Sequence, residues 1–168
     1  MGVIEESGIL AIATRMQRLS EQMRKDALLI YKAHGIDFEP KWFPVMYTLH
    51  FNPVLSIVEV ASEIGYSHPS TIILLKELEK LKFIRSSKDK ADERKRLVQL
   101  TEKGKQLIEQ MRPAWEIMIS AATELTNTQN NLMKALDEVE QQMEIQSFYQ
   151  RAKSHMAANQ SKKNELNN

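Results

Sequence analysis

The sequence predicts a mostly α-helical fold that includes one small β-hairpin, and three patterns lead to this class. Apolar residues recur at helical spacing in a long segment toward each end of the chain. Between these segments lie two shorter helical stretches, separated by a glycine and a tight turn. Two short segments on either side of a charged loop follow, and this is the pattern of a hairpin.

The composition is typical of one compact domain with long helical extensions. The chain has 168 residues, of which 42% are apolar and 27% charged. No apolar run reaches the length of about 18 residues that a membrane helix needs, and the N-terminus MGVIEESGIL lacks the pattern of a secretory signal. The absence of cysteine excludes disulfides and cysteine-based catalysis. We therefore expect a cytoplasmic protein.

The N-terminal part predicts one long helix over 7–34, ended by Gly35. A shorter, mostly buried helix is expected over 42–50, and a short strand over 55–57 after the turn at Asn52-Pro53. The short elements that follow cannot by themselves bury the apolar face of so long a helix, so we assign 1–35 as a dimerisation helix.

The central part predicts a helix-turn-helix unit. A short helix over 58–64 ends at Gly65, and a tight turn over 66–68 leads into a second helix that runs to about Leu81. Pro69 suits the first turn of that helix, because the N–H that it lacks is not needed there.

A hairpin with a basic tip, or wing, is expected next. The strands are predicted over 83–87 and 94–100, around the charged loop 88–93. Together with the preceding helices they define a winged helix-turn-helix over 36–101.

The C-terminal part predicts further dimerisation helices over 102–157. Thr101 is a good N-cap for a helix that runs to about Leu125, with a kink at Pro113, and a last helix is expected over 129–156. The polar segment 158–168 is expected to be a disordered tail. The predicted fold is thus one intertwined domain with long N- and C-terminal dimerisation helices.

Charge is segregated along the chain although the net charge is only +1. Residues 76–105 hold 11 Lys and Arg against 6 Asp and Glu, a net charge of +5, while the other residues hold 12 against 16, a net charge of −4. Nucleic-acid-binding modules gather positive charge in this way, although a solvated helix face with a chance imbalance is the alternative.

From Trp42 to about Leu107 the chain resembles the MarR family of bacterial transcription regulators. The stretch DERKRLVQLTEKG over 92–104 resembles the family's wing pattern of Asp-x-Arg, a strand, and Leu-Thr-x-x-Gly. The stretch GYSHPST over 65–71, with LEK over 78–80, resembles the recognition-helix region. The resemblance implies a homodimer on a palindromic site in double-stranded DNA, with each recognition helix in a major groove and each wing at a minor groove.

The exposed face of the helix from His68 to Leu81 is expected to read the bases. Ile72 and Ile73 stand where relatives usually have polar residues, and either they touch thymine methyl groups or they pack against the protein; we favour packing for Ile72 and DNA contact for Ile73. Ser67 and His68 could also serve only to cap the helix. The candidate DNA-binding residues of this helix are Ser67, His68, Pro69, Ser70, Ile73 and Lys76.

In the wing, Arg94 is the first candidate, because a guanidinium fits the narrow minor groove of A·T-rich DNA. Asp92 would be repelled by phosphate, so we expect it to play a structural role, either orienting the wing or pairing with a nearby arginine. Solvated surface charge is the alternative for each other basic residue of the wing. The candidate contacts to the DNA backbone are Lys88, Lys90, Lys95 and Arg96.

Members of the family often bind small aromatic effectors, and this chain has a matching group of residues. Aromatic and apolar side chains with a few polar groups suit a small-molecule cavity, although packing in the core explains the same residues and is the interpretation we favour. The candidate effector pocket comprises Phe38, Trp42, Phe43, Met46, Tyr47, His50, Met111 and Trp115.

Other function classes find little support in the sequence. The five scattered glycines form no phosphate-binding loop, and no HExxH or GxSxG motif occurs, so we expect no enzyme. The four histidines are scattered, so we expect neither a metal nor another cofactor. The alternative function is a helical dimerisation or adaptor protein that does not bind DNA.

Overall fold

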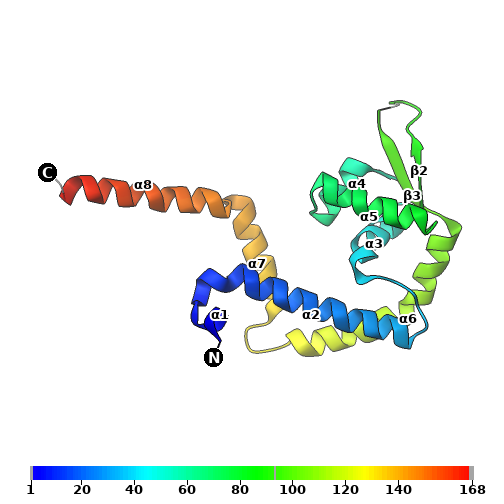
Figure 1. The fold of residues 1–168 in the computed structure, drawn as a ribbon, viewed down its shortest axis with the longest axis horizontal. Coiled ribbons are helices and arrows are strands. Elements are labelled where there is room, and N and C mark those ends of the chain that lie inside the picture. The colour runs from blue at the N-terminus through cyan, green and yellow to red at the C-terminus, as the bar shows by residue number, and fades with distance from the viewer. Residues whose placement is uncertain (1, 93, 167–168) are drawn as a thin grey trace. The chain divides into compact units, whose positions relative to one another are not determined.

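The computed structural model describes residues 2–92 and 94–166, which fall into two compact units divided between Met118 and Ile119. The mostly helical class with a small antiparallel sheet is confirmed (Figure 1). The elements in chain order are α1 (Val3–Glu6), η1 (Gly8–Ala11), α2 (Ile12–Ala33), η2 (Pro40–Trp42), α3 (Phe43–Phe51), β1 (Leu55–Ser56), α4 (Ile57–Ile64), α5 (His68–Lys80), β2 (Ile84–Lys88), β3 (Arg96–Leu100), α6 (Glu102–Thr126), α7 (Leu132–Ile145) and α8 (Phe148–Leu166).

The long N-terminal helix begins later than the sequence predicts. In place of one helix over 7–34, α1 and the 3-10 turn η1 precede α2. The reason is Gly8, whose φ of +56° interrupts the right-handed helical path. The predicted end is confirmed: Gly35 takes φ +67° and the N–H of Ile36 donates to the carbonyl of Tyr31 at 2.9 Å.

The helix-turn-helix unit is confirmed in α4 and α5. Ser56 and Glu59 form a reciprocal capping box at the start of α4, and Gly65 ends that helix with φ +68°. Helix α5 then buries Thr71, Leu74, Leu75 and Leu78 on its inner face. This burial leaves the opposite face of α5 free to meet a partner.

The sheet has the strand order β1-β3-β2, and both pairings are antiparallel. In the hairpin, Ile84 pairs with Leu100, Ser86 with Val98, and Lys88 with Arg96. Val98 and Leu100 belong to the same hydrophobic core as the inner face of α5. The base of the hairpin is therefore packed on the core, and the hairpin projects away from α3, α4 and α5 (Figure 1).

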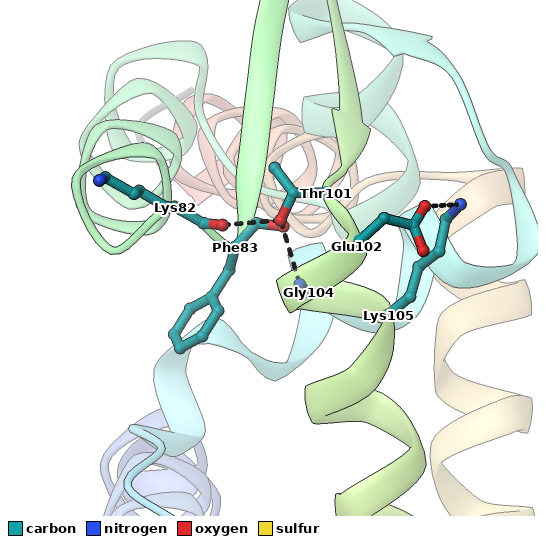
Figure 2. A network of polar contacts seen from close by, with 6 residues as sticks. All are labelled: Lys82, Phe83, Thr101, Glu102, Gly104 and Lys105. Atoms are coloured by element: carbon teal, nitrogen blue, oxygen red, sulfur yellow. Dashed lines mark hydrogen bonds and ion pairs between the residues drawn. The ribbon is translucent and has the colours of Figure 1, made fainter.

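A polar network joins the hairpin to the start of α6 (Figure 2). Thr101 is the predicted N-cap: its hydroxyl accepts a hydrogen bond from the N–H of Gly104 at 3.1 Å and donates to the carbonyl of Lys82 at 2.6 Å. The N–H of Thr101 also donates to the carbonyl of Phe83 at 3.0 Å. One threonine thus starts α6 and holds it against the turn that follows α5.

The C-terminal helices differ from the prediction in one respect. Helix α6 is continuous through Pro113, and the kink there stays a prediction. The single helix expected over 129–156 is wrong, because α7 and α8 are separate. The backbone of Gln146 is extended, and Ser147 starts α8 by accepting a hydrogen bond from the N–H of Gln150 and donating its own N–H to the Gln150 side chain. No glycine or proline marks this break.

The backbone of 158–166 is helical as part of α8, although the sequence predicts a disordered tail over 158–168. The segment is polar but contains neither glycine nor proline, so nothing in its backbone chemistry stops the helix. Across residues 2–92 and 94–166 no helix is both long and apolar enough to cross a membrane, and no three His, Asp or Glu side chains gather as a metal site.

Candidate nucleic-acid interface

The N-terminal turn of α5 places four candidate residues together on the surface. Ser67 is the N-cap: its hydroxyl accepts from the N–H of Ser70 at 3.3 Å, and the two hydroxyl groups are 2.8 Å apart. His68 and Pro69 complete this exposed turn. Capping therefore occupies Ser67 and the N–H of Ser70, while the positive end of the helix favours phosphate at this exposed turn.

The outer face of α5 continues with Ile73 and Lys76. The side chain of Ile73 is 59% exposed, and Lys76 is exposed as well. Ile72 is half-buried and lies between the outer and inner faces. More than half of the Ile73 side chain is not buried within the protein. This apolar surface is therefore available for contact with a partner.

Two carboxylates hold the second half of α5, and the sequence analysis did not find them. The Glu77 carboxylate accepts a hydrogen bond from the Trp42 ring N–H at 2.7 Å and an ion pair from the Lys41 ammonium at 2.7 Å. Both contacts lower the pKa of Glu77, and the contact with Lys41 has the larger effect. Glu79 accepts hydrogen bonds from both the N–H and the hydroxyl of Ser86, at 3.1 and 2.6 Å. No local pattern pairs residue 79 with residue 86.

The tip of the wing is shaped by two aspartates. The Asp89 carboxylate accepts from the N–H of Ala91 at 2.8 Å, and the Asp92 carboxylate accepts from the N–H of Arg94 at 3.1 Å. The carbonyl of Asp92 accepts from the N–H of Lys95 at 2.9 Å. Asp92 thus contacts the backbone on which Arg94 is carried, and not the Arg94 guanidinium.

The basic residues of the wing fall into two groups. Lys88, Lys90 and Arg94 are exposed and extend the basic surface toward the tip. Lys95 is also exposed, and it lies near enough to Glu59 to contribute, as the smallest of the causes, to the lowered pKa of that carboxyl group. The Arg96 guanidinium donates to the Ser86 hydroxyl.

The predicted effector residues range from fully buried through half-buried to exposed. Phe38, Met46 and Met111 are almost completely buried and belong to the hydrophobic core. Trp42 packs edge-on against Phe38, with ring centroids 5.7 Å apart. Half-buried His50 packs against the exposed ring of Phe51, with centroids 5.0 Å apart.

The remaining three residues form an aromatic cluster, in which Phe43 and Tyr47 are exposed and Trp115 is half-buried. The Trp115 ring stands edge-on to both Phe43 and Tyr47 at 5.6 Å, and Phe43 and Tyr47 are 36% and 41% exposed. The Trp115 ring N–H donates to the Tyr31 hydroxyl at 2.8 Å. This cluster can offer aromatic surface to a ligand, whereas the buried group supports the core.

Helices α4 and α5, the turn between them and the basic hairpin define the chain as a winged helix-turn-helix protein. No family model and no curated protein sequence matches it. Solved structures of transcriptional regulators do match. The CouR repressor bound to a DNA duplex is 22% identical, with a TM-score of 0.66 over 79% of this chain and 96% of CouR.

Two further regulators have similar values. A mutant of MarR from E. coli, complexed with operator DNA, is 15% identical, with a TM-score of 0.67 over 84% of this chain and 98% of MarR. PcaV from Streptomyces coelicolor, in complex with its natural ligand, is 14% identical, with a TM-score of 0.65 over 86% of this chain and 97% of PcaV. At these identities the likeness establishes the fold.

Proposed function

We propose that this protein is a transcriptional regulator of the MarR type that binds a specific sequence in double-stranded DNA. The observation that carries the proposal is the exposure, on one module, of the N-terminal turn of α5 and of the basic wing. The turn offers the hydroxyl and ring groups of Ser67, His68 and Ser70, and the wing offers Arg94. These are the two contacts that a winged helix makes with the major and minor grooves.

The proposed protein acts as a homodimer on a palindromic site. Helix α2 exposes Ile12, Met16 and Leu19 at helical spacing, with exposed fractions of 50, 49 and 44%. In the C-terminal unit, α7 exposes Val139 and Met143 at 52 and 54%. Apolar stripes of this kind mark interaction surfaces, and a second copy is the simplest partner. Segments 1–35 and 102–157 are therefore assigned to dimerisation.

A small-molecule effector is proposed to modulate DNA binding. The aromatic cluster of Phe43, Tyr47 and Trp115, two of whose rings are exposed, supports this, as does the ligand found in the PcaV structure. An aromatic molecule is the class of ligand that such a cluster favours. The protein is proposed to work in the cytoplasm and not as an enzyme.

The decisive experiment is selection of bound fragments from random duplex DNA, followed by titration of the selected duplex and a scrambled one at several salt concentrations. We expect a palindromic site, preference over the scrambled duplex, and affinity that falls with salt because bound phosphates release counterions. Light scattering at micromolar concentration should give a dimer. A dimer that retains no DNA fragment at any salt concentration would favour the adaptor function instead.

Two substitutions separate the roles of wing residues. Arg94→Ala should weaken binding most on sites with A·T-rich flanks, because it removes a guanidinium from a narrow minor groove. Lys88→Ala should weaken binding to all sequences alike and reduce the salt slope by about one. The wing assignment is wrong if folded Arg94→Ala binds every duplex as the unchanged protein does.

A further inference from the structure

A series of side-chain hydrogen bonds connects the wing to the recognition helix and involves residues of α5, β2 and β3. β2 is the edge strand of the sheet, and its residue Ser86 donates both its N–H and its hydroxyl to Glu79 on α5. Arg96 on β3 donates its guanidinium to the same hydroxyl. We refer to Glu79, Ser86 and Arg96 as the wing clamp.

The hydrogen-bonding capacity of Ser86 matches this arrangement. A serine hydroxyl has one hydrogen to donate and two lone pairs that accept, and here it donates to a carboxylate and accepts from a guanidinium. Both neighbours are charged, and bonds to charged partners are shorter and stronger than those between neutral groups. The clamp therefore resists bending of the hairpin better than exposed neutral contacts would.

The position of the clamp along the hairpin allows it to restrict movement of the tip. Arg96 pairs with Lys88 at the tip end of the strands, and its side chain reaches back to Ser86, which pairs with Val98. Arg94 lies two residues beyond Arg96, in the tip. The clamp thus holds the tip half of the hairpin against the helix that carries Ile73 and Lys76.

We propose that Glu79 and Arg96 are positioning residues that hold the wing at the angle to α5 at which both elements meet the same DNA. The inference rests on the proposed DNA binding. It also changes the expected role of Arg96, from a contact with the DNA backbone to a support for the residue that makes the contact. A rigid link between two binding elements raises affinity because less freedom is lost on binding.

The sign of the effect distinguishes positioning from simple electrostatics. Glu79 is an exposed carboxylate on the face of the module that would approach phosphates. Removing its charge should by itself tighten DNA binding. If Glu79 holds the wing, Glu79→Ala should instead weaken binding to the selected site, on the order of tenfold, because hydrogen bonds to a charged acceptor are lost.

The first experiment examines the free protein and needs no DNA. Amide hydrogen exchange by NMR should show that the Ser86 N–H exchanges faster in Glu79→Ala than in the unchanged protein, while the amides of α4 keep their protection. Glu79→Gln retains an acceptor oxygen and should preserve much of the protection. Unchanged exchange at Ser86 in Glu79→Ala would show that the clamp does not exist in solution.

The second experiment is a double-mutant cycle on the selected duplex. Arg94→Ala should cost at least threefold less affinity in the Glu79→Ala background than in the unchanged protein, because a misplaced wing makes less use of Arg94. Lys76→Ala, on α5 itself, should cost the same in both backgrounds. Glu63→Ala removes an exposed carboxylate from α4 and should tighten binding slightly, which controls for charge.

Arg96 is tested in the Arg94→Ala background. A positioning residue acts in part through Arg94, so Arg96→Ala should cost less affinity there than in the unchanged protein. An equal loss in both backgrounds, with the salt slope reduced by about one in each, would identify Arg96 as a phosphate contact and overturn its proposed role. Additive losses for Glu79→Ala and Arg94→Ala, or equal weakening by Glu79→Ala and Glu79→Gln, would likewise overturn the proposal. If the unchanged protein binds no duplex, the proposed function fails, and Ser86 exchange alone decides whether the clamp exists.

Discussion

Replacing Gly104 with alanine tests the packing that joins the hairpin to α6. Gly104 is the third residue of α6, and a Cβ atom there would lie 2.1 Å from the carbonyl oxygen of Phe83 and 3.1 Å from its carbonyl carbon. That carbonyl belongs to the backbone and accepts a hydrogen bond from the N–H of Thr101 at 3.0 Å. To relieve the overlap, the helix must move from the hairpin by roughly 1 Å.

Opposing contributions set the size of the effect. Alanine is the better helix former, which favours the variant by up to about 1 kcal/mol. Forcing an extra carbon into a packed site costs about 1–3 kcal/mol. The movement also weakens the Thr101 cap, whose loss costs about 0.5–2 kcal/mol. We therefore expect Gly104→Ala to lower the free energy of unfolding by about 2 kcal/mol.

The assay is urea unfolding followed by circular dichroism, with all variants at one protomer concentration because a dimer's stability depends on it. Gln106→Ala, at an exposed position of the same helix, is the matched control and should change the unfolding free energy by less than about 0.5 kcal/mol. A Gly104→Ala protein as stable as the unchanged one, or more stable, would refute the packing argument.

Three further substitutions have expected outcomes of defined sign. Lys82 lies in the turn just after α5 and has φ +61°, a conformation that costs a residue with a side chain more than it costs glycine. Lys82→Gly should therefore raise the free energy of unfolding by about 0.5–1 kcal/mol in the same urea assay. Tyr31→Phe leaves the ring N–H of Trp115 without its acceptor and should lower the free energy of unfolding by about 1–2 kcal/mol. Burial raises the pKa of Tyr31, so stability should fall as the pH rises above the unfolded value of about 10, and fall less in Tyr31→Phe. Ile73→Ala should reduce preference for thymine at one position of the selected site by on the order of 1 kcal/mol, measured by competition between duplexes; equal competition by all bases before and after the change would contradict a base contact.

Local chemistry explains where prediction from sequence succeeds. Gly65 ends α4, Ser67 caps α5 and Thr101 caps α6, and each of these effects acts within a few residues along the chain. The break between α7 and α8 is also local, but it is made by Ser147 and Gln150 and contains no glycine or proline. Because the apolar periodicity continues through this break, the sequence predicts one helix where the structure has two.

The sequence by itself determined the order of helices, the helix-turn-helix and the basic hairpin, because hydrophobic period and turn residues act at short range. Only the tertiary structure decided which polar groups meet. Trp115 and Tyr31 are 84 residues apart. Glu79 reaches Ser86 only because the chain reverses direction at Lys82, after the end of α5. It also decided that Phe38 and Met46 are core residues while Phe43 and Tyr47 are exposed, because burial depends on how distant elements pack and residue type leaves it open.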